Sequence, residues 1–337
     1  MKGFDEKQVL GLIMSKMGNT NLEPLFGKDD ISIVSLEKII KKPIKDYSLA
    51  ATCDMLVEHT DVPPKMTFKQ IARKSLVSCL SDLSTKGIRP VVALVSLGIP
   101  LSLNKRNVRD IIKGFSVTSK EFGFFIIGGD INQSKELIID CCMLGFANNN
   151  LKTPRRNGAI IDDYVIVSGP FGYSSSGLKI LLNDSKSPSN LFKKKSIESV
   201  LNPLPQIKFG LKLSKYLSSS IDSSDGLAKS LYELAKESKV NMLIYKDKIP
   251  IPPELNKFST INNLSVDDLI FYGGEEYHII GTIPKKNIIK VNHLVKKYCL
   301  DFFIIGRVVH GVGNKVFVVY PNEQKRLLKN QGFTHLT

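Results

Sequence analysis

Apolar residues recur along the chain with two different spacings, and the two spacings alternate. Apolar positions three or four residues apart predict helices over residues 5–17, 68–83, 108–122 and 175–182, and a further helix that begins just after Asp225. Short runs rich in Val, Ile, Leu and Phe predict extended segments over residues 47–54, 91–97, 124–127, 136–146, 164–168 and 316–319. Because strands alternate with helices in both halves, we expect an α/β or α+β fold.

A polar, turn-rich stretch separates the two halves. Residues 148–158 have the sequence NNNLKTPRRNG and interrupt the alternation of strands and helices. We therefore expect two domains, over residues 1–150 and 151–337. Residues 183–206 are polar and contain several prolines, and we expect them to form a mobile loop.

The composition is that of an ordinary globular protein, with 42% hydrophobic and 23% charged residues among 337. No apolar run approaches the roughly 20 residues that a membrane span needs, and the first residues lack a secretory-signal pattern. We therefore expect a cytoplasmic protein with no membrane partner. The five cysteines form no Cys-x-x-Cys pair and their number is odd, so neither a disulfide framework nor a zinc site is predicted.

The chain carries a formal net charge of +15, which favours anionic partners. Its lysines are scattered, however, and the densest run is only Lys193-Lys194-Lys195. No zinc-finger spacing or aromatic-rich RNA-binding segment accompanies them. We expect a solvated basic surface that steers anionic small molecules, and no nucleic-acid partner.

The most informative chemical feature is a series of aspartates beside small residues at the ends of apolar segments. The series comprises Asp29, Asp30, Asp54, Asp82, Asp130, Asp222 and Asp225. Converging carboxylates repel one another unless a cation lies between them, and Mg²⁺ commonly joins one or two carboxylates to substrate phosphates. The series therefore predicts a site for Mg²⁺ and a polyphosphate.

Most of these aspartates also have a purely structural interpretation. The structural roles are a helix cap for Asp225 or Ser224, a turn for Asp130, a helix surface for Asp82 and a loop for Asp29 and Asp30. Asp54 is harder to explain in this way because it stands between apolar stretches. The joint occurrence of these acids in one chain favours the metal site.

Several common catalytic motifs are missing from the sequence. No Gly-x-x-x-x-Gly-Lys-Ser/Thr occurs, which excludes a P-loop nucleotide site. The five histidines form no His-x-x-x-His pair, so a zinc enzyme is not predicted. The run from Gly172 to Gly177 has one residue too many for the nucleophile elbow of a hydrolase.

A series of short motifs runs in order through almost the whole chain. It consists of Lys-Asp-Asp (28–30), Thr-Cys-Asp-Met-Leu-Val-Glu (52–58), Leu-Ser-Asp-Leu (80–83), Gly-Gly-Asp (128–130), Arg-Arg-Asn-Gly-Ala (155–159), Ile-Asp-Ser-Ser-Asp-Gly-Leu (221–227), Gly-Gly-Glu-Glu-Tyr (273–277) and Gly-Phe-Thr-His (332–335). The series resembles the thiamine-monophosphate kinase family, within the superfamily typified by aminoimidazole ribonucleotide synthetase. The motifs at 221–227 and 273–277 are the most specific part of the resemblance.

The resemblance implies two α/β domains, a homodimer formed through the N-terminal sheets, and ATP bound in a cleft between the domains. It also implies transfer of the γ-phosphoryl group of ATP to thiamine monophosphate, with several Mg²⁺ ions. The implied Mg²⁺ ligands are Asp29, Thr52, Asp54, Asp82, Asp130, Asp222 and Asp225, of which Asp130, Asp222 and Asp225 are expected to act in catalysis. The implied nucleotide contacts are Gly129, Asp130, Arg156 and Ser224, and the implied substrate contacts are Glu275, Phe333, and His59 or Asp61.

The chain departs from the family pattern at several positions. Lys28 replaces the usual glycine, Cys53 replaces Ser or Thr, and Glu276 replaces Asp. The place of a family histidine falls on Asp61, with His59 two residues earlier. Two alternatives remain: a sister ATP-dependent enzyme on the same fold, and a catalytically silent nucleotide-binding regulator. The retained aspartates argue against the silent regulator.

Overall fold

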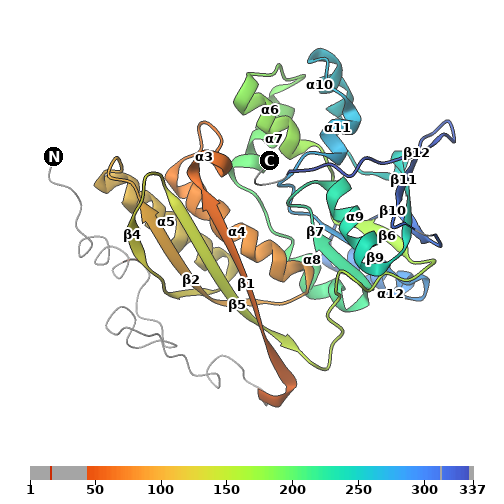
Figure 1. Cartoon of the computed structure of the whole chain (residues 1–337), viewed down its shortest axis with the longest axis horizontal. Helices are drawn as coiled ribbons and strands as arrows, with labels where there is room; N and C mark the ends of the chain where they lie inside the picture. Colours follow the sequence, from red (N-terminus) through yellow and green to blue (C-terminus); the bar gives the residue numbers. More distant parts are fainter. Residues whose placement is uncertain (1–15, 17–43, 312, 334–337) are drawn as a thin grey trace. The chain divides into compact units, whose positions relative to one another are not determined.

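The computed structural model describes Lys16, residues 44–311 and residues 313–333, and these residues divide into two compact units (Figure 1). The first unit comprises the described residues up to Leu83 together with Ile88–Leu151. The second comprises Ser84–Gly87 and the described residues from Lys152 onward. Apart from Lys16, the helix expected over residues 5–17 lies outside the described residues, as do Asp29 and Asp30.

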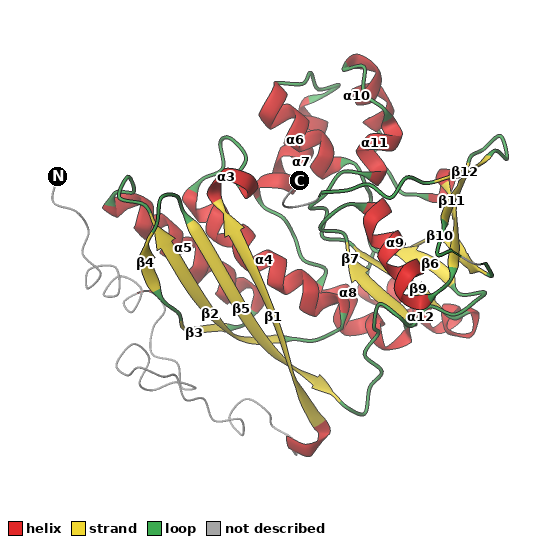
Figure 2. Cartoon of the chain, in the orientation of Figure 1, coloured by secondary structure: helices red, strands yellow, loops and turns green. Residues whose placement is uncertain are grey.

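The first unit is a mixed sheet with two long helices on one face (Figure 2). Its elements are η1 (Ile44–Asp46), β1 (Tyr47–Val57), α3 (Glu58–Asp61), α4 (Phe68–Thr85), β2 (Pro90–Ile99), α5 (Lys105–Phe122), β3 (Phe125–Gly128), β4 (Ile131–Gln133) and β5 (Ile138–Asn148). The strand order is β1-β5-β2-β3, and β4 also pairs with β2. Strand β5 is antiparallel to both β1 and β2, whereas β2 runs parallel to β3 and β4.

Helix α5 of the first unit begins and ends where its sequence provides caps. The side chain of Asn104 accepts hydrogen bonds from the backbone N–H groups of Arg106 and Asn107 at the start of α5. Gly123 ends α5 with a φ of 72°, a left-handed conformation that glycine adopts without steric cost. The predicted end of this helix at Phe122 is therefore confirmed.

The second unit contains a larger sheet with helices around it (Figure 2). Its elements are β6 (Tyr164–Val167), α6 (Tyr173–Asn183), α7 (Asn190–Leu201), α8 (Ile207–Leu213), η2 (Ser214–Tyr216), β7 (Ser219–Asp222), α9 (Leu227–Ser238), β8 (Asn241–Tyr245), η3 (Lys246–Lys248), α10 (Leu255–Ile261), α11 (Val266–Phe271), β9 (Ile279–Ile283), η4 (Lys285–Asn287), α12 (Ile288–Tyr298), β10 (Phe303–Val309), β11 (Val316–Val319) and β12 (Lys325–Leu327). The strand order is β12-β11-β8-β10-β6-β9-β7. All neighbours are antiparallel except β11 and β8.

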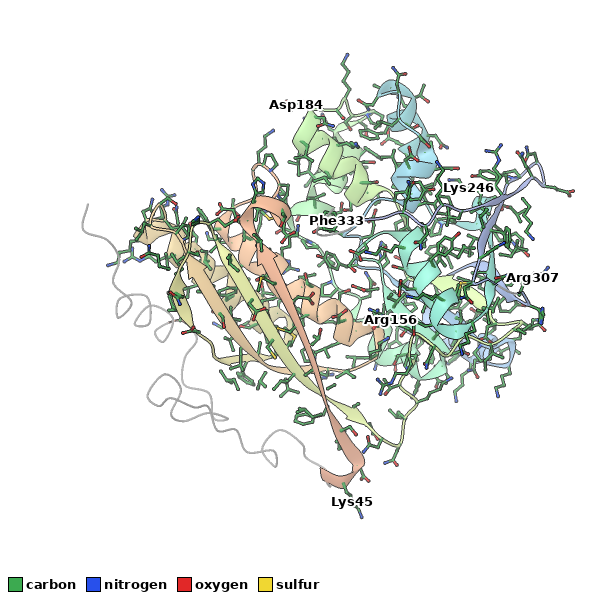
Figure 3. The ribbon with its side chains drawn as sticks, in the orientation of Figure 1. Lys45, Arg156, Asp184, Lys246, Arg307 and Phe333 are labelled. Carbon is green, nitrogen blue, oxygen red and sulfur yellow. The ribbon has the colours of Figure 1, made fainter. Side chains whose placement is uncertain are left out.

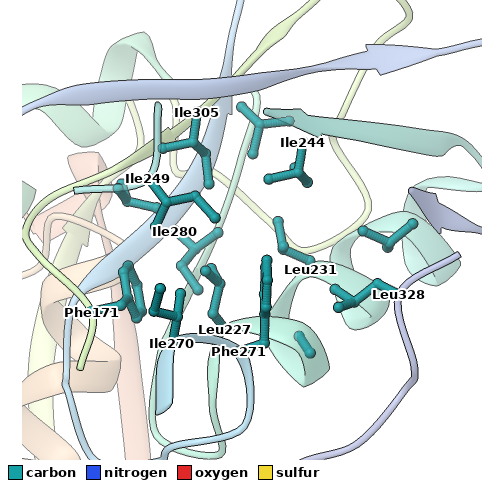
Figure 4. Close-up of a cluster of buried hydrophobic side chains, with 14 of the residues drawn as sticks. Phe171, Leu227, Leu231, Ile244, Ile249, Ile270, Phe271, Ile280, Ile305 and Leu328 are labelled. Carbon is teal, nitrogen blue, oxygen red and sulfur yellow. The ribbon is translucent and has the colours of Figure 1, made fainter. Parts of the chain in front are cut away.

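The core of the second unit forms between α9 and this sheet (Figure 4). Leu227 and Leu231 lie one turn apart on α9, and both are fully buried. They belong to the same apolar cluster as Ile244 of β8, Ile280 of β9 and Phe271 at the end of α11. Burial of each such side chain contributes about 1.5–3 kcal/mol to the stability of the fold, so α9 is held firmly against the sheet.

One sequence-based expectation about this unit was wrong. Residues 183–206 were expected to be a mobile loop, but half of them form the helix α7. Ser189 caps the helix by accepting a hydrogen bond from the N–H of Phe192. Phe192 and Val200 are buried two turns apart, and the Phe192 ring lies 5.3 Å from that of Phe258. The run of three lysines concealed this apolar face, because it made the stretch polar on average while lying on the exposed side of the helix.

The other expected elements within the described residues are confirmed, with small differences at their ends. The mixed α/β class is confirmed as well. The short strand β4 was not expected, because three residues carry too little pattern to predict a strand. Among the described residues, no helix has both the length and the apolar character that a bilayer span requires.

Candidate active site

In the first unit, three of the predicted metal ligands lie together. Thr52 and Asp54 occupy the same face of β1 because strand side chains alternate. The hydroxyl of Thr52 donates a 2.6 Å hydrogen bond to the carboxylate of Asp82 on α4. The thiol of Cys79, one turn before Asp82 on the same helix, lies close to Asp54 and donates a 3.1 Å hydrogen bond to the carbonyl of Cys141. The interpretation of Asp82 as a plain surface residue is therefore wrong.

The electrostatics of this cluster favour a bound cation. Burial raises the pKa of Asp54 from 3.8 to about 6, and the nearby carboxylates of Asp82 and Asp140 raise it too. The nearby thiol of Cys79 has the opposite effect on that pKa. A cation bound to these oxygens would lower the pKa of Asp54, since it would replace repulsion between carboxylates by attraction.

Asp130 does not join this cluster. It lies at the turn between β3 and β4, where its backbone carbonyl accepts a 2.8 Å hydrogen bond from the N–H of Leu97. Because β5 and β2 separate β3 from β1, its backbone lies about 14 Å from Asp54 across the sheet. Gly129 has a φ of 153°, and a Cβ there would lie 1.8 Å from the carbonyl oxygen of Val95. The glycine thus allows the turn to press against β2 and leaves Asp130 exposed.

His59 and Asp61, the two candidates left open for one substrate contact, differ in their contacts and in their exposure. The carboxylate of Asp61 accepts a 2.7 Å hydrogen bond from the backbone N–H of Val57, which precedes α3. Asp61 is half-buried and holds the start of its own helix. His59 is exposed, and its backbone N–H donates to Glu136. His59 is therefore better placed to reach a ligand.

In the second unit, the predicted acids Asp222 and Asp225 lie at the two ends of a tight turn. Asp222 is the last residue of β7 and is 5% exposed, whereas Asp225 precedes α9 and is partly exposed. The residue that caps α9 is Gly226, and no side chain caps the helix. The interpretation of Asp225 or Ser224 as a helix cap is therefore wrong. The Asp225 carboxylate instead pairs with Lys229, at 2.7 Å.

The loop that carries Glu275 is hydrogen-bonded to this turn. The N–H of Glu275 donates to the carbonyl of Ser224 at 2.7 Å, and the N–H of Tyr277 donates to the carbonyl of Ser223 at 3.2 Å. A Cβ at Gly274 would lie 2.6 Å from the Ser224 carbonyl oxygen, so the close approach requires glycine there. The candidate substrate residue Glu275 is thereby held beside the candidate metal ligands.

Of two further predicted residues, Phe333 lies near the same turn, whereas Arg156 lies beside the start of β7 and the C-terminal end of α9 (Figure 3). The N–H of Phe333 donates to the carbonyl of Asp225 at 3.1 Å, which places the C-terminal segment against the turn. Arg156 is exposed and follows Arg155, whose carbonyl accepts a hydrogen bond from the N–H of Ser220 on β7. The strip of chain that carries Arg156 therefore runs alongside the strand that ends at Asp222.

Several polar residues of these sites were not predicted. Asp140 lies in the apolar strand β5 and accepts a 3.4 Å hydrogen bond from the thiol of Cys53, on the face of the sheet opposite to Thr52 and Asp54. Glu276 accepts N–H donors at the start of α6, and His278 has a buried Nδ1 that lacks a partner among the described residues. Lys229 pairs with Asp225. A lone carboxylate inside an apolar strand was a detectable signal for Asp140, and Glu276 stood out as a departure from the family motif, whereas nothing local marked His278 or Lys229.

The donor set fits Mg²⁺ in character. Hydroxyl and carboxylate oxygens dominate both groups of residues, and these are the ligands that hard cations prefer. Within the described ranges, no three His, Cys, Asp or Glu side chains gather closely enough to hold a metal ion by themselves. Such incomplete sites suit Mg²⁺, which usually takes one or two carboxylates and completes its shell with water and substrate phosphates.

Comparison with known proteins identifies relatives over nearly the whole chain. A family model described as AIR synthase related protein, N-terminal domain, matches residues 29–147. The thiamine-monophosphate kinase of Nitrosopumilus maritimus (strain SCM1) is 35% identical over 336 residues, 99% of each chain. That of Pyrococcus horikoshii is 35% identical over 285 residues, 84% of each chain. The solved structure of AaThiL complexed with AMPPCP and TMP is 28% identical, with a TM-score of 0.75 over 86% of this chain and 88% of that chain. The chain therefore belongs to the thiamine-monophosphate kinase family.

Proposed function

We propose that this protein transfers the γ-phosphoryl group of ATP to the phosphate of thiamine monophosphate, which gives thiamine diphosphate and ADP. Family membership supports the reaction class. The observation that carries the proposal for this chain is the set of hydrogen bonds in the second unit. These bonds join the Asp222–Asp225 turn to Glu275 and to Phe333, so residues proposed for metal, nucleotide and substrate are held together.

We further propose that the acids of each unit bind Mg²⁺. The proposed ligands are Thr52, Asp54 and Asp82 in the first unit, Asp222 and Asp225 in the second, and additionally Asp29 and Asp130. Bound Mg²⁺ screens the charge of the phosphates and stabilises the charge that spreads over the transferring group. The raised pKa of Asp54 supports its assignment, because a carboxylate desolvated beside Asp82 gains most from a cation.

The protein's own residues would orient the two anionic reactants. We propose that Gly129, Arg156 and Ser224 contact the nucleotide and that Glu275, His59 and Phe333 contact thiamine monophosphate. His59 is preferred to Asp61 because the Asp61 carboxylate already accepts the Val57 N–H. The Arg156 guanidinium is exposed, so it can approach a phosphate without breaking an ion pair in the described part of the chain.

The transfer should be direct. In this step an oxygen of the acceptor phosphate forms a bond to the γ-phosphorus, the bond to the β–γ bridging oxygen breaks, and ADP leaves with the electron pair. A phosphate monoester is mostly deprotonated near neutral pH, since its second pKa is about 6. A strong general base is therefore unnecessary, and positioning and electrostatics supply the rate. Recovery of radiolabelled phosphate covalently bound to the protein, after incubation with labelled ATP, would exclude direct transfer.

We also propose that the protein is a homodimer formed through the first unit. The long helices α4 and α5 lie on one face of its sheet (Figure 2). The opposite face of β1 exposes Leu49 and Met55, whose residues are 64% and 61% accessible to solvent. Phe125 of β3 is also exposed. Large apolar side chains gathered on a sheet face favour a protein partner, and a second copy of the same face would cover them.

The decisive test is conversion of thiamine monophosphate to thiamine diphosphate by the purified protein, with ATP and with or without Mg²⁺. We expect Mg²⁺-dependent product, and a fall in kcat/KM of about two orders of magnitude or more in Asp222→Asn. The matched control is Asp301→Asn, which makes the same change at an exposed acid before β10. Binding of AMPPCP without any turnover in wild-type protein would favour the silent regulator instead.

A further inference from the structure

One face of the N-terminal half of α9 is bonded to the C-terminal segment 328–333. Lys229 and Tyr232 are three residues apart and lie on the same side of the helix, and Asp225 lies in the turn just before it. The Lys229 ammonium donates a 2.7 Å hydrogen bond to the carbonyl of Phe333. The hydroxyl of Tyr232 donates to the carbonyl of Leu328 at 2.5 Å. The segment is therefore attached to α9 at both of its ends.

Lys229 occupies the central position in this arrangement because it has two acceptors at once. Its ammonium lies 2.7 Å from an Asp225 carboxylate oxygen and 2.7 Å from the Phe333 carbonyl oxygen. The Phe333 N–H returns a 3.1 Å hydrogen bond to the Asp225 carbonyl. These three bonds close a ring between the Asp225 turn, the first turn of α9 and the C-terminal segment.

The segment approaches α9 closely at Gly332. A Cβ at Gly332 would lie 2.3 Å from the carbonyl oxygen of Asp225 and 3.0 Å from the Cβ of Lys229. Only a residue without a side chain allows this approach, so the position of Phe333 depends on the backbone of the Asp225 turn. The Lys229 side chain is 31% exposed, and therefore its ammonium remains partly solvated.

We propose that Lys229 is a positioning residue that fastens Phe333 to the metal-ligand turn, and that its charge competes with Mg²⁺ for Asp225. The proposal deepens the proposed function and rests on it, because it takes Asp225 as a metal ligand and Phe333 as a substrate contact. Loss of Lys229 then has two effects of opposite sign. Thiamine monophosphate binds more weakly because Phe333 is released, while less Mg²⁺ is needed because a neighbouring cation has been removed.

The test uses the full chain and three variants. Lys229→Met removes the charge and both bonds but keeps most of the apolar stem, and Lys229→Arg keeps the charge. Lys236→Met is the matched control, since Lys236 is exposed and lies two turns further along α9. Hydrogen exchange of the peptide that contains residues 328–333 reports on the attachment without any catalysis. Steady-state kinetics then give KM for each substrate and the half-saturating Mg²⁺ concentration.

In Lys229→Met we expect exchange at the Phe333 amide to accelerate about five- to tenfold, because the loss of a charged hydrogen bond loosens the segment. We expect KM for thiamine monophosphate to rise by a similar factor, while KM for ATP stays within about twofold. The half-saturating Mg²⁺ concentration should fall about two- to fivefold, a modest factor because both groups are partly solvated. Lys229→Arg and Lys236→Met should resemble the wild type in exchange.

The outcomes separate the parts of the proposal. Unchanged exchange in Lys229→Met would overturn the attachment whatever the kinetics show. Faster exchange with an unchanged KM for thiamine monophosphate would overturn the role of the segment in substrate binding. A raised Mg²⁺ requirement would overturn the competition, because general damage to the turn weakens metal binding. Wild-type protein without kinase activity would refute the proposed function, and the exchange measurement would still decide the attachment.

Discussion

The loop before β9 contains two titratable groups whose pKa values are shifted in opposite directions. Burial raises the pKa of Glu276 from 4.5 to about 7, even though its carboxylate accepts N–H donors from Gly172, Tyr173 and Ser174. Burial lowers the pKa of His278 from 6.5 to about 4. The folded protein therefore favours the neutral form of both groups, and each should make stability depend on pH in its own direction.

The sign of each contribution follows from proton linkage. The folded state holds the Glu276 proton more tightly than the unfolded chain does, so this contribution to the free energy of unfolding is lost as pH rises toward about 7. The folded state binds a proton at His278 less tightly, so that contribution is lost as pH falls toward about 4. For each group the pKa in the folded state differs from the ordinary pKa by about 2.5, which corresponds to a change of about 3 kcal/mol in the free energy of unfolding. The two contributions change with pH in opposite directions, so they largely cancel in the wild type.

Single substitutions should reveal how each group alone makes the free energy of unfolding depend on pH. Glu276→Gln keeps an acceptor for the N–H groups of α6 but does not ionise, and His278→Gln keeps a donor of similar reach. Between about pH 4.5 and about pH 8, Glu276→Gln should gain about 3 kcal/mol of stability relative to the wild type. His278→Gln should lose about 3 kcal/mol relative to the wild type as pH rises from about 4 to about 6.5. Glu237→Gln, at an exposed position of α9, is the control.

The assay is urea unfolding followed by circular dichroism, because the chain has no tryptophan. The compared quantity is the difference in free energy of unfolding between variant and wild type at each pH, which removes the titration of every other group. If that difference stays constant across the range for Glu276→Gln, Glu276 binds its proton equally well in both states. The reasoning from burial would then be refuted.

Three further perturbations test other parts of the structure. At pH values above about 6, the folded protein must ionise the desolvated carboxyl of Asp54, so Asp54→Asn should raise the melting temperature there by a few degrees. The same variant should lose most of its kinase activity. An unchanged melting temperature would contradict the raised pKa of Asp54. Gly129→Ala should lower the free energy of unfolding in urea by about 2–4 kcal/mol, because the new Cβ would overlap a backbone carbonyl. In Gly123→Ala the new Cβ meets no atom within 4 Å, so that variant should lose only about 1 kcal/mol. Met55→Asp should convert a dimer to a monomer by light scattering, and Leu191→Asp, equally exposed on α7, should not; a monomeric wild type would refute the dimer.

The sequence predicted an element correctly where the pattern of apolar residues and the local chemistry agree. For α5 the apolar period and Gly123 gave the correct end of the helix, but the predicted start at residue 108 lies three residues after the observed start at Lys105, where Asn104 caps the helix. α7 was missed because three consecutive lysines dominate its average polarity, while Phe192 and Val200 supply the buried face at wider spacing. Average polarity therefore misleads for a helix that buries only a narrow apolar stripe.

The sequence predicted the identity of many candidate site residues and little of their geometry. Glu275 and Tyr277 adopt positive φ values of 61° and 53°, which neither residue type favours. The carbonyls of Ser224 and Ser223 impose this conformation by accepting their N–H groups. The bond between Lys229 and Phe333 joins residues 104 positions apart, and no local pattern encodes such a contact. These features arise from tertiary structure, which overrides local preference at the site.

The second unit holds its candidate residues mainly through the backbone. The N–H groups of Glu275, Tyr277 and Phe333 all donate to carbonyls of the Asp222–Asp225 turn, so their positions do not depend on which side chain each residue carries. Lys229 is the exception, because its side chain supplies the bond. A family built in this way can change the side chains that face the ligand while the turn keeps its shape. Side-chain substitutions at Glu275 should therefore affect binding far more than stability, whereas substitutions at Lys229 should affect both.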